Sequence, residues 1–139
     1  MLIAAQIVAA LAAALHVVFF MFESVLWTRP RVFGRFGIAN QADADTIKPM
    51  AYNQGFYNLA LAVGTVVGIV LLGIGHGPGP GHGGGVFVAG KALVVFATAC
   101  MCVAGIVLAT TGRAYRRSAA IQFVPAALAL VLVSVVPGG

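Results

Sequence analysis

Residues 2–22 read LIAAQIVAALAAALHVVFFMF, a run of 21 residues without an Asp, Glu, Lys or Arg. A helix needs about 20 mostly apolar residues to cross the hydrocarbon core of a bilayer. This run meets that requirement and stays largely apolar to Trp27, so we expect a first membrane span over about residues 2–27. No cationic segment precedes the run, and it is longer than the apolar part of a signal peptide. We therefore interpret it as a retained helix.

Three further apolar runs have the same character, over about residues 50–74, 86–111 and 119–136. The chain is 61% hydrophobic and 8% charged, whereas about a quarter of the residues of a soluble domain are charged. A lipid-facing fold does not need a polar coat, so this composition favours a membrane protein. We predict a single all-α membrane domain over residues 1–139, built as a four-helix bundle.

The basic residues are concentrated in two of the three connections. Seven of the eight lie within residues 28–49 and 112–118, and the connection at 75–85 (GHGPGPGHGGG) has no charged residue. Because basic residues stay on the cytoplasmic side, we expect both termini and the glycine-rich connection outside the cell membrane. Anchoring at an anionic membrane face explains the net charge of +5 without a nucleic-acid partner.

The first connection carries helix signals of its own. Residues 40–48 are predicted to form a short interfacial helix capped by Asn40. Pro30 and Pro49 bracket the connection, as residues that end or start helices do. In the second connection, His76 and His82 are interpreted as parts of a flexible linker, because a metal site there would need a rigid frame.

The first span contains two costly polar residues, His16 and Glu23. A charge at the bilayer centre costs about 2.5–3.5 kcal/mol on insertion scales, so such exceptions are informative. The two are seven residues apart and would lie on one face of an α-helix. Phe20 and Trp27 continue this face at helical spacing. We expect His16 near mid-membrane and Glu23 about one turn from the cytoplasmic end.

The second span opens with YNQGFYN at residues 52–58. Its polar residues are expected on one side of the helix, within about 140° at 100° per residue. Gly64 and Gly68 continue that side as a GxxxG pair, which lets another helix approach closely and is a candidate surface for a homo-oligomer. Gln122 lies near the cytoplasmic end of the fourth span.

If these groups converge, they form a polar pocket in the cytoplasmic half of the bundle. Glu23 and His16 are the candidate catalytic residues, with Glu23 donating or accepting a proton. The candidate ligand-binding residues are Trp27, Asn53, Gln54, Tyr57, Asn58 and Gln122. The alternatives are that Glu23 reaches headgroup water or pairs with Arg29 or Arg31, that His16 forms a hydrogen bond between helices, and that the amides hold helices together. Lys91 is expected to extend to the outer interface.

Motifs for several common chemistries are absent from the sequence. It has no phosphate-binding glycine loop after a strand, no zinc-ligand spacing, no GxSxG elbow and no haem-attachment CxxCH. Cys100 and Cys102 are expected on roughly opposite sides of a helix, where they neither pair nor share a metal easily. We therefore predict no cofactor, no metal and no nucleic-acid partner.

The chain resembles a family of small bacterial four-helix membrane proteins, domain-of-unknown-function family thirteen-oh-four. The resemblance rests on His16, the FxxESxLW-like segment Phe20–Trp27, the basic stretch after it, and NQGFYN at Asn53–Asn58. It covers nearly the whole chain. The resemblance implies the four-helix membrane architecture and supports the choice of unusual residues, and it implies no particular chemistry.

Three functions fit a membrane pocket of this kind. The first is binding or isomerisation of a small lipophilic molecule, with Glu23 as acid or base. The second is a non-catalytic accessory subunit that holds a lipid, a quinone or a partner protein. The third is a small proton-coupled exporter. Because alternating access favours a site at the midplane and Glu23 lies nearer the cytoplasmic end, we rank the exporter last.

Overall fold

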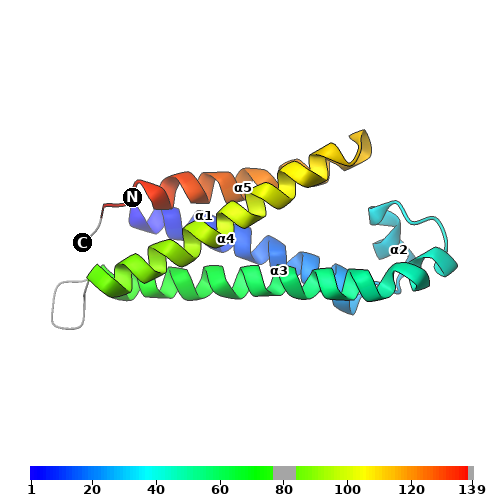
Figure 1. Ribbon diagram of the computed structural model, residues 1–139, viewed down its shortest axis with the longest axis horizontal. Helices are drawn as coiled ribbons and strands as arrows, with labels where there is room; N and C mark the ends of the chain where they lie inside the picture. Colours follow the sequence, from blue (N-terminus) through cyan, green and yellow to red (C-terminus); the bar gives the residue numbers. More distant parts are fainter. Residues whose placement is uncertain (77–83, 138–139) are drawn as a thin grey trace. The chain divides into compact units, whose positions relative to one another are not determined.

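All regular secondary structure in the described part of the chain, residues 1–76 and 84–137 of this computed structural model, is helical (Figure 1). The elements are α1 (Leu2–Phe20), the π-helix η1 (Met21–Val25), α2 (Pro30–Phe33), the 3₁₀-helix η2 (Gly34–Phe36), α3 (Gln41–Gly75), α4 (Gly84–Thr110), the 3₁₀-helix η3 (Arg113–Tyr115) and α5 (Arg116–Ser134). The prediction of an all-α chain is confirmed.

Within residues 1–76 and 84–137, four helical segments are long and apolar enough to cross a membrane. They are Leu2–Val25, Gln41–Gly75, Gly84–Thr110 and Arg113–Ser134. Each has at least the roughly 20 residues that a bilayer requires. These segments are typical of a multi-pass membrane protein and agree with the four predicted spans. The side of the membrane on which each connection lies stays a prediction.

The second spanning helix begins earlier than predicted, at Gln41 instead of about residue 50. Asn40 caps it as expected, because its Oδ1 accepts a hydrogen bond from the Asp43 N–H at 2.9 Å. The predicted interfacial helix is not separate, since α3 continues through Pro49. The prediction that Pro49 marks a helix boundary is therefore wrong, whereas Pro30 stands in the first turn of α2, where its missing N–H has no cost.

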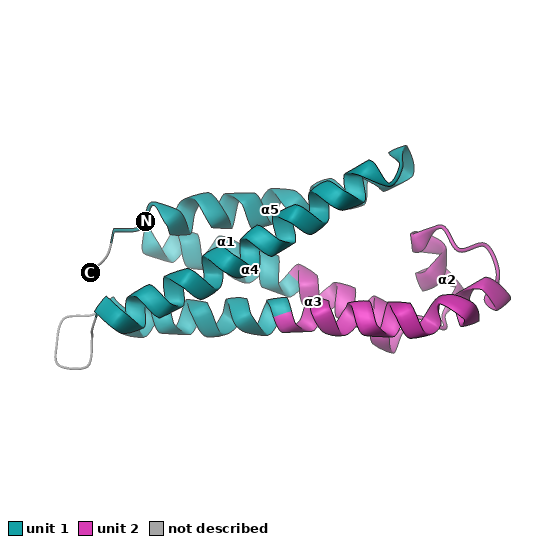
Figure 2. Ribbon diagram, in the orientation of Figure 1, with its two compact units in different colours: residues 1–14, 61–139 teal, residues 15–60 magenta. Residues whose placement is uncertain are grey.

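The chain divides into two compact units (Figure 2). Unit 1 comprises residues 1–14 and 61–139, and unit 2 comprises residues 15–60. Helices α1 and α3 contribute residues to both units. Each unit has hydrophobic clusters of its own and is described by itself below. The single membrane domain expected over residues 1–139 stays a prediction.

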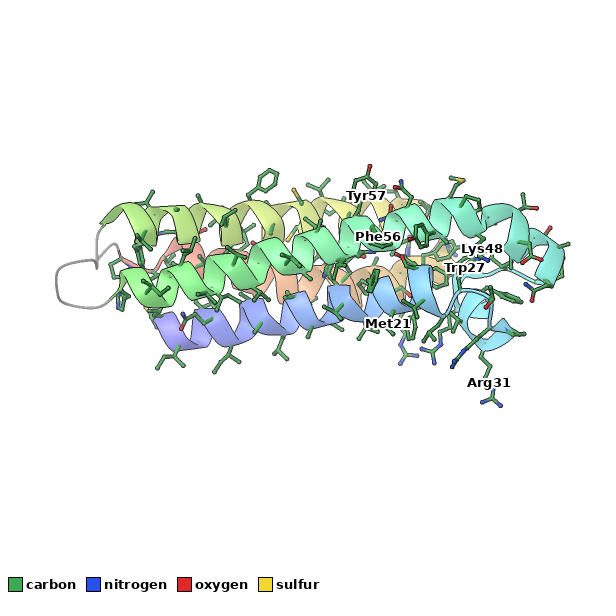
Figure 3. The ribbon with its side chains drawn as sticks, turned by 90° about the horizontal axis from the view of Figure 1, so that it is seen from below. Met21, Trp27, Arg31, Lys48, Phe56 and Tyr57 are labelled. Atoms are coloured by element: carbon green, nitrogen blue, oxygen red, sulfur yellow. The ribbon has the colours of Figure 1, made fainter. Side chains whose placement is uncertain are left out.

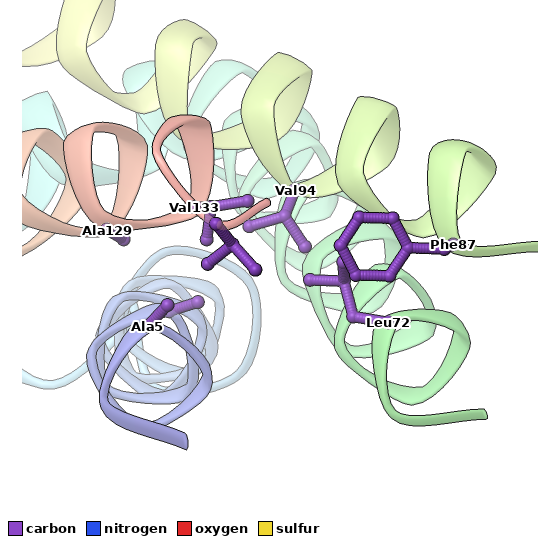
Figure 4. Packing of buried hydrophobic residues seen from close by; sticks show 8 residues of the cluster. Ala5, Leu72, Phe87, Val94, Ala129 and Val133 are labelled. Carbon is purple, nitrogen blue, oxygen red and sulfur yellow. The ribbon is translucent and has the colours of Figure 1, made fainter. Parts of the chain in front are cut away.

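Unit 1 packs parts of four helices around small and medium-sized apolar side chains. Figure 4 shows Ala5 from α1, Leu72 from α3, Phe87 and Val94 from α4, and Ala129 and Val133 from α5 in one buried cluster. A second cluster contains buried residues of α1, α4 and α5. Five of the twelve buried residues in the two clusters are alanine. Such small side chains let helix backbones approach closely, as is typical of helix packing in membranes.

One of the close helix approaches in unit 1 involves Gly68 of α3. A Cβ atom at Gly68 would lie 2.7 Å from Val94 Cγ2 and 2.9 Å from the Gly90 carbonyl oxygen. A Cβ atom at Gly64 would meet nothing within 4 Å. The two glycines of the GxxxG pair therefore differ. Gly68 packs against α4 of the same chain, and no neighbour occupies the space beside Gly64. A homo-oligomer through these residues stays a prediction.

Lys91 of α4 binds the end of α5. Its Nζ donates a hydrogen bond to the Val136 carbonyl oxygen at 2.8 Å, just beyond the end of α5. A cation is favoured at the C-terminal end of a helix, where carbonyl groups have no helical partner. The side chain is half-buried, and its extension to the outer interface stays a prediction.

Unit 2 has an aromatic core. Its buried residues are Trp27, Phe33, Ala44 and Ala51. The indole Nε1 of Trp27 donates a buried hydrogen bond of 2.8 Å to the Ala44 carbonyl oxygen. Trp27 lies in a turn after η1, so the predicted continuous helical stripe from Phe20 to Trp27 is wrong. The residue connects the turn to the first part of α3.

Candidate functional site

The π-helix η1 sets the local geometry around Glu23. The Leu26 N–H donates to the Met21 carbonyl oxygen at 2.8 Å, which is the hydrogen bond over five residues that defines a π turn. Such turns are rare and are frequent at functional sites. The expectation that His16 and Glu23 share a face assumed an α-helix throughout. That assumption fails at Met21, so their spacing of seven no longer determines their relative direction.

Glu23 is hydrogen-bonded to one of the predicted ligand-binding residues. Asn58 Nδ2 donates to Glu23 Oε2 at 2.7 Å. Asn58 is 6% exposed, and Glu23 is half-buried. The distance is within the normal range of an N–H···O hydrogen bond. The structure therefore joins a carboxyl group from the end of the first span to an amide from the second.

A second contact brings η1 close to α3. Ser24 Oγ donates to the Tyr52 carbonyl oxygen at 2.8 Å. A Cβ atom at Gly55 would overlap Ser24 Oγ and lie 3.1 Å from the Ser24 backbone nitrogen. The glycine is therefore needed for this close approach. Sequence reasoning assigned no role to Ser24 or Gly55, although both belong to the two motifs that carry the family resemblance.

Only part of the predicted amide cluster faces inward. Within unit 2, α3 buries Ala51, Gly55 and Asn58, which follow one another at spacings of four and three residues. The other three predicted contacts are exposed: Asn53, Gln54 and Tyr57. Tyr57 is 61% exposed and points away from the ribbon in Figure 3. These three do not converge on Glu23 within the unit, and their role in ligand binding stays a prediction.

Aromatic rings flank the Glu23 segment. The rings of Phe20 and Phe56 meet edge to face with centroids 5.3 Å apart, and Phe56 contacts Tyr52 at 4.9 Å. His16 is 1% exposed and lies edge-on to Phe19 at 5.4 Å. His16 is therefore a buried residue of α1. Its burial fits a structural role, in which it binds another helix, as well as a catalytic role.

The remaining candidates lie elsewhere. Trp27 is 5% exposed and packs on Phe36 with centroids 5.2 Å apart, so its ring serves the core of unit 2. Gln122 is half-buried and belongs to unit 1. His76 stacks near Phe87, and His82 lies outside the described residues. Among the described residues, no three His, Cys, Asp or Glu side chains are grouped to hold a metal ion.

Two surface pockets accompany these elements. One, of about 410 Å³, lies between α4 and α5 in unit 1. The other, of about 240 Å³, lies in unit 2 beside Gly37, Asp43 and Thr46. Neither is lined by Glu23, Asn58 or another predicted site residue. The polar pocket expected around Glu23 stays a prediction, and what the structure provides there is a hydrogen-bonded pair framed by aromatic rings.

Comparison with known proteins identifies the family. The model of the family described as "Protein of unknown function (DUF1304)" matches residues 10–134. The chain belongs to this family. The match includes Glu23, Ser24, Gly55 and Asn58, and it confirms the family resemblance drawn from the residues. Searches of curated proteins and of solved structures give no match.

Proposed function

We propose that this membrane protein binds a small lipophilic molecule beside Glu23 and isomerises it by proton transfer. One observation carries the proposal: the Glu23 carboxyl group stands on a π turn and accepts a hydrogen bond of 2.7 Å from the buried Asn58. An ionisable group within an apolar span is costly to place there. A function that uses the carboxyl group would explain why such a residue is present there.

The surroundings of Glu23 suit an acid–base role. Asn58 holds Oε2, which fixes the carboxyl group and leaves Oε1 as the atom that would exchange a proton. Phe20 and Phe56 supply aromatic faces beside the turn. Such faces bind apolar molecules and stabilise a nearby cation. The site therefore combines a positioned carboxyl group with groups that tolerate developing positive charge.

The reaction that fits these groups is the movement of a carbon–carbon double bond. The protonated Glu23 carboxyl group adds its proton to one carbon of the double bond, which leaves a carbocation at the other carbon. The resulting carboxylate then removes a proton from the neighbouring carbon, and the double bond forms one position further along. One C–H bond forms and one breaks, so the reaction is balanced without an oxidant, a reductant or a further co-reactant.

A deuterium-exchange experiment tests the proposal. Purified protein in detergent is incubated in D₂O with a total lipid extract of its host membranes, and the extract is analysed by mass spectrometry. We expect one lipophilic component to gain deuterium on carbon with the unmodified protein. The Glu23→Gln variant should not support this exchange, because the amide does not donate or accept the proton.

Asp45→Asn is the matched control. It makes the same change from carboxylate to amide at an exposed position of unit 2, so it should leave the exchange intact. Carbon-bound deuterium that is independent of Glu23 would overturn the catalytic role. A component that co-purifies in a Glu23-dependent manner without gaining deuterium would instead identify the protein as a non-catalytic lipid-binding subunit.

A further inference from the structure

The surface pocket described above in unit 1 is a groove between the end of α4 and the start of α5. Residues within 105–110 and 116–123 line its volume of about 410 Å³, which is within the usual range of small-molecule sites, about 300–1,000 Å³. Its floor is set by Gly105, where a Cβ atom would lie 3.0 Å from Phe123 Cβ. The two helices therefore pack closely below the groove and leave it open above.

The groove is apolar along its length and cationic at one end. Its walls are made largely of Ile106, Ala109, Ala120 and Phe123, and its one charged lining residue is Arg116. Arg116 is the first residue of α5, so it lies at the end nearest the connection to α4. From Arg116 to Phe123 the helix rises by about 10 Å. This length suits a hydrocarbon chain with a polar group at its end.

The charges of unit 1 lack acidic partners in their own part of the sequence. Residues 61–139 contain Lys91, Arg113, Arg116 and Arg117 and no Asp or Glu. Lys91 binds the Val136 carbonyl oxygen. Any anion that pairs with the three exposed arginines therefore comes from outside unit 1. A guanidinium group matches a phosphate group with two parallel hydrogen bonds, and membrane surfaces supply phosphate on anionic lipids.

We propose that this groove binds an anionic phospholipid. One acyl chain lies between α4 and α5, and the headgroup phosphate accepts hydrogen bonds from the Arg116 guanidinium group. Arg113 and Arg117 flank Arg116 in the sequence and add positive charge, which disfavours the cationic headgroup of a zwitterionic lipid. Glu23 does not line this groove, so the lipid-binding proposal can be tested separately from the proposed isomerisation.

Native mass spectrometry of the purified protein tests the headgroup contact. The probes are phosphatidylglycerol and phosphatidylcholine with the same acyl chains, titrated separately. We expect Arg116→Gln to weaken phosphatidylglycerol binding roughly tenfold, because it removes a hydrogen-bonded charge pair. The matched control is Arg117→Gln, which removes the same charge one residue away but does not line the groove. Equal losses in both variants would mean general charge attraction and would overturn the site.

A second pair of variants tests the acyl-chain groove. Ala120→Leu adds bulk to the groove wall, and Ala92→Leu makes the same change at another exposed position, on α4 outside the groove. We expect Ala120→Leu to reduce phosphatidylglycerol binding roughly fivefold, by loss of apolar contact area, and Ala92→Leu to have no effect. If Ala120→Leu instead abolishes a dimer and leaves lipid binding unchanged, the groove is occupied by a second copy of the chain and the lipid proposal is wrong.

Discussion

The two units of the molecule differ in how their helices are held together. Unit 1 packs mainly alanine and valine side chains, and its residues, 1–14 and 61–139, include no acidic residue. Unit 2 contains all three acidic residues of the chain, an aromatic core, and hydrogen bonds from Ser24, Trp27 and Asn58 to other segments. Unit 1 also has hydrogen bonds from side chains to other segments, from Gln6 to Ile69 and from Lys91 to Val136, but those of unit 2 fall within only 46 residues.

This difference suggests a division of roles. Close packing of small residues is sufficient to associate helices in a membrane, where no hydrophobic driving force acts between them. The polar contacts of unit 2 go beyond that requirement, and two of them, those of Ser24 and Asn58, lie at the π turn that carries Glu23. The proposed function therefore places the chemistry in unit 2, and the following variants test that proposal.

The largest loss of stability is expected from Trp27→Ala. It removes a buried aromatic side chain from the core of unit 2, together with its hydrogen bond to Ala44. Substitutions of this kind cost about 3–5 kcal/mol. Unfolding in mixed micelles with increasing SDS measures the effect. Trp27→Phe keeps most of the ring and should lose only about 1 kcal/mol, for the hydrogen bond. Equal losses in both variants would show that packing of the ring contributes little.

Glycine substitutions should separate close helix contacts from open positions in both units. Gly68→Ala in unit 1 and Gly55→Ala in unit 2 place a Cβ atom against neighbouring backbone. We expect each to destabilise the protein by about 1–3 kcal/mol, as overpacking does. Gly64→Ala is the control, because nothing lies within 4 Å of its Cβ position, and it should be neutral or gain about 1 kcal/mol from helix propensity. A Gly64→Ala loss as large as the others would contradict this arrangement.

The smallest effect on stability is expected from Asn58→Leu. The substitution removes the hydrogen bond to Glu23, and hydrogen bonds between helices in membranes contribute about 0.6 kcal/mol on average, with a maximum of about 1.7. Asn53→Leu is the matched control at an exposed position of the same helix. In the deuterium-exchange assay, by contrast, we expect a large effect: Asn58→Leu should lower exchange strongly, and Asn53→Leu should not. Equal exchange in the two variants would remove Asn58 from the site.

The sequence predicted the architecture well because membrane insertion is governed by run length and charge. The four spans and the Asn40 cap follow from these local signals. The length of α3 did not, because Pro49 was interpreted as a helix boundary and instead lies inside the helix, where a proline removes one helical hydrogen bond. The partner of Lys91 could not be predicted either, since Val136 is 45 residues away in the chain.

The site was predicted only in part, for a geometric reason. Helical spacing assigned the side chains of YNQGFYN to a broad polar face, but only the narrower stripe through Gly55 and Asn58 is buried. Composition alone does not distinguish these neighbours. The π turn that begins at Met21 also changes the directions in which the following side chains point, and no residue in the sequence MFESV predicts such a turn. Glu23 was found because a carboxyl group in an apolar run is itself the signal.

The most direct test of the central claim uses the fact that Glu23 is the only glutamate in the chain. Protein labelled with ¹³C at the side-chain carboxyl carbon (Cδ) of glutamate gives a single glutamate carboxyl resonance. This resonance is recorded before and after addition of the host lipid extract. If Glu23 binds a lipophilic ligand and is hydrogen-bonded to Asn58, the chemical shift of this resonance should change when the extract is added. Before the addition, its chemical shift should differ from the unmodified protein in Asn58→Leu and should be the same in Asn53→Leu. A resonance that responds neither to the extract nor to Asn58→Leu would contradict the claim.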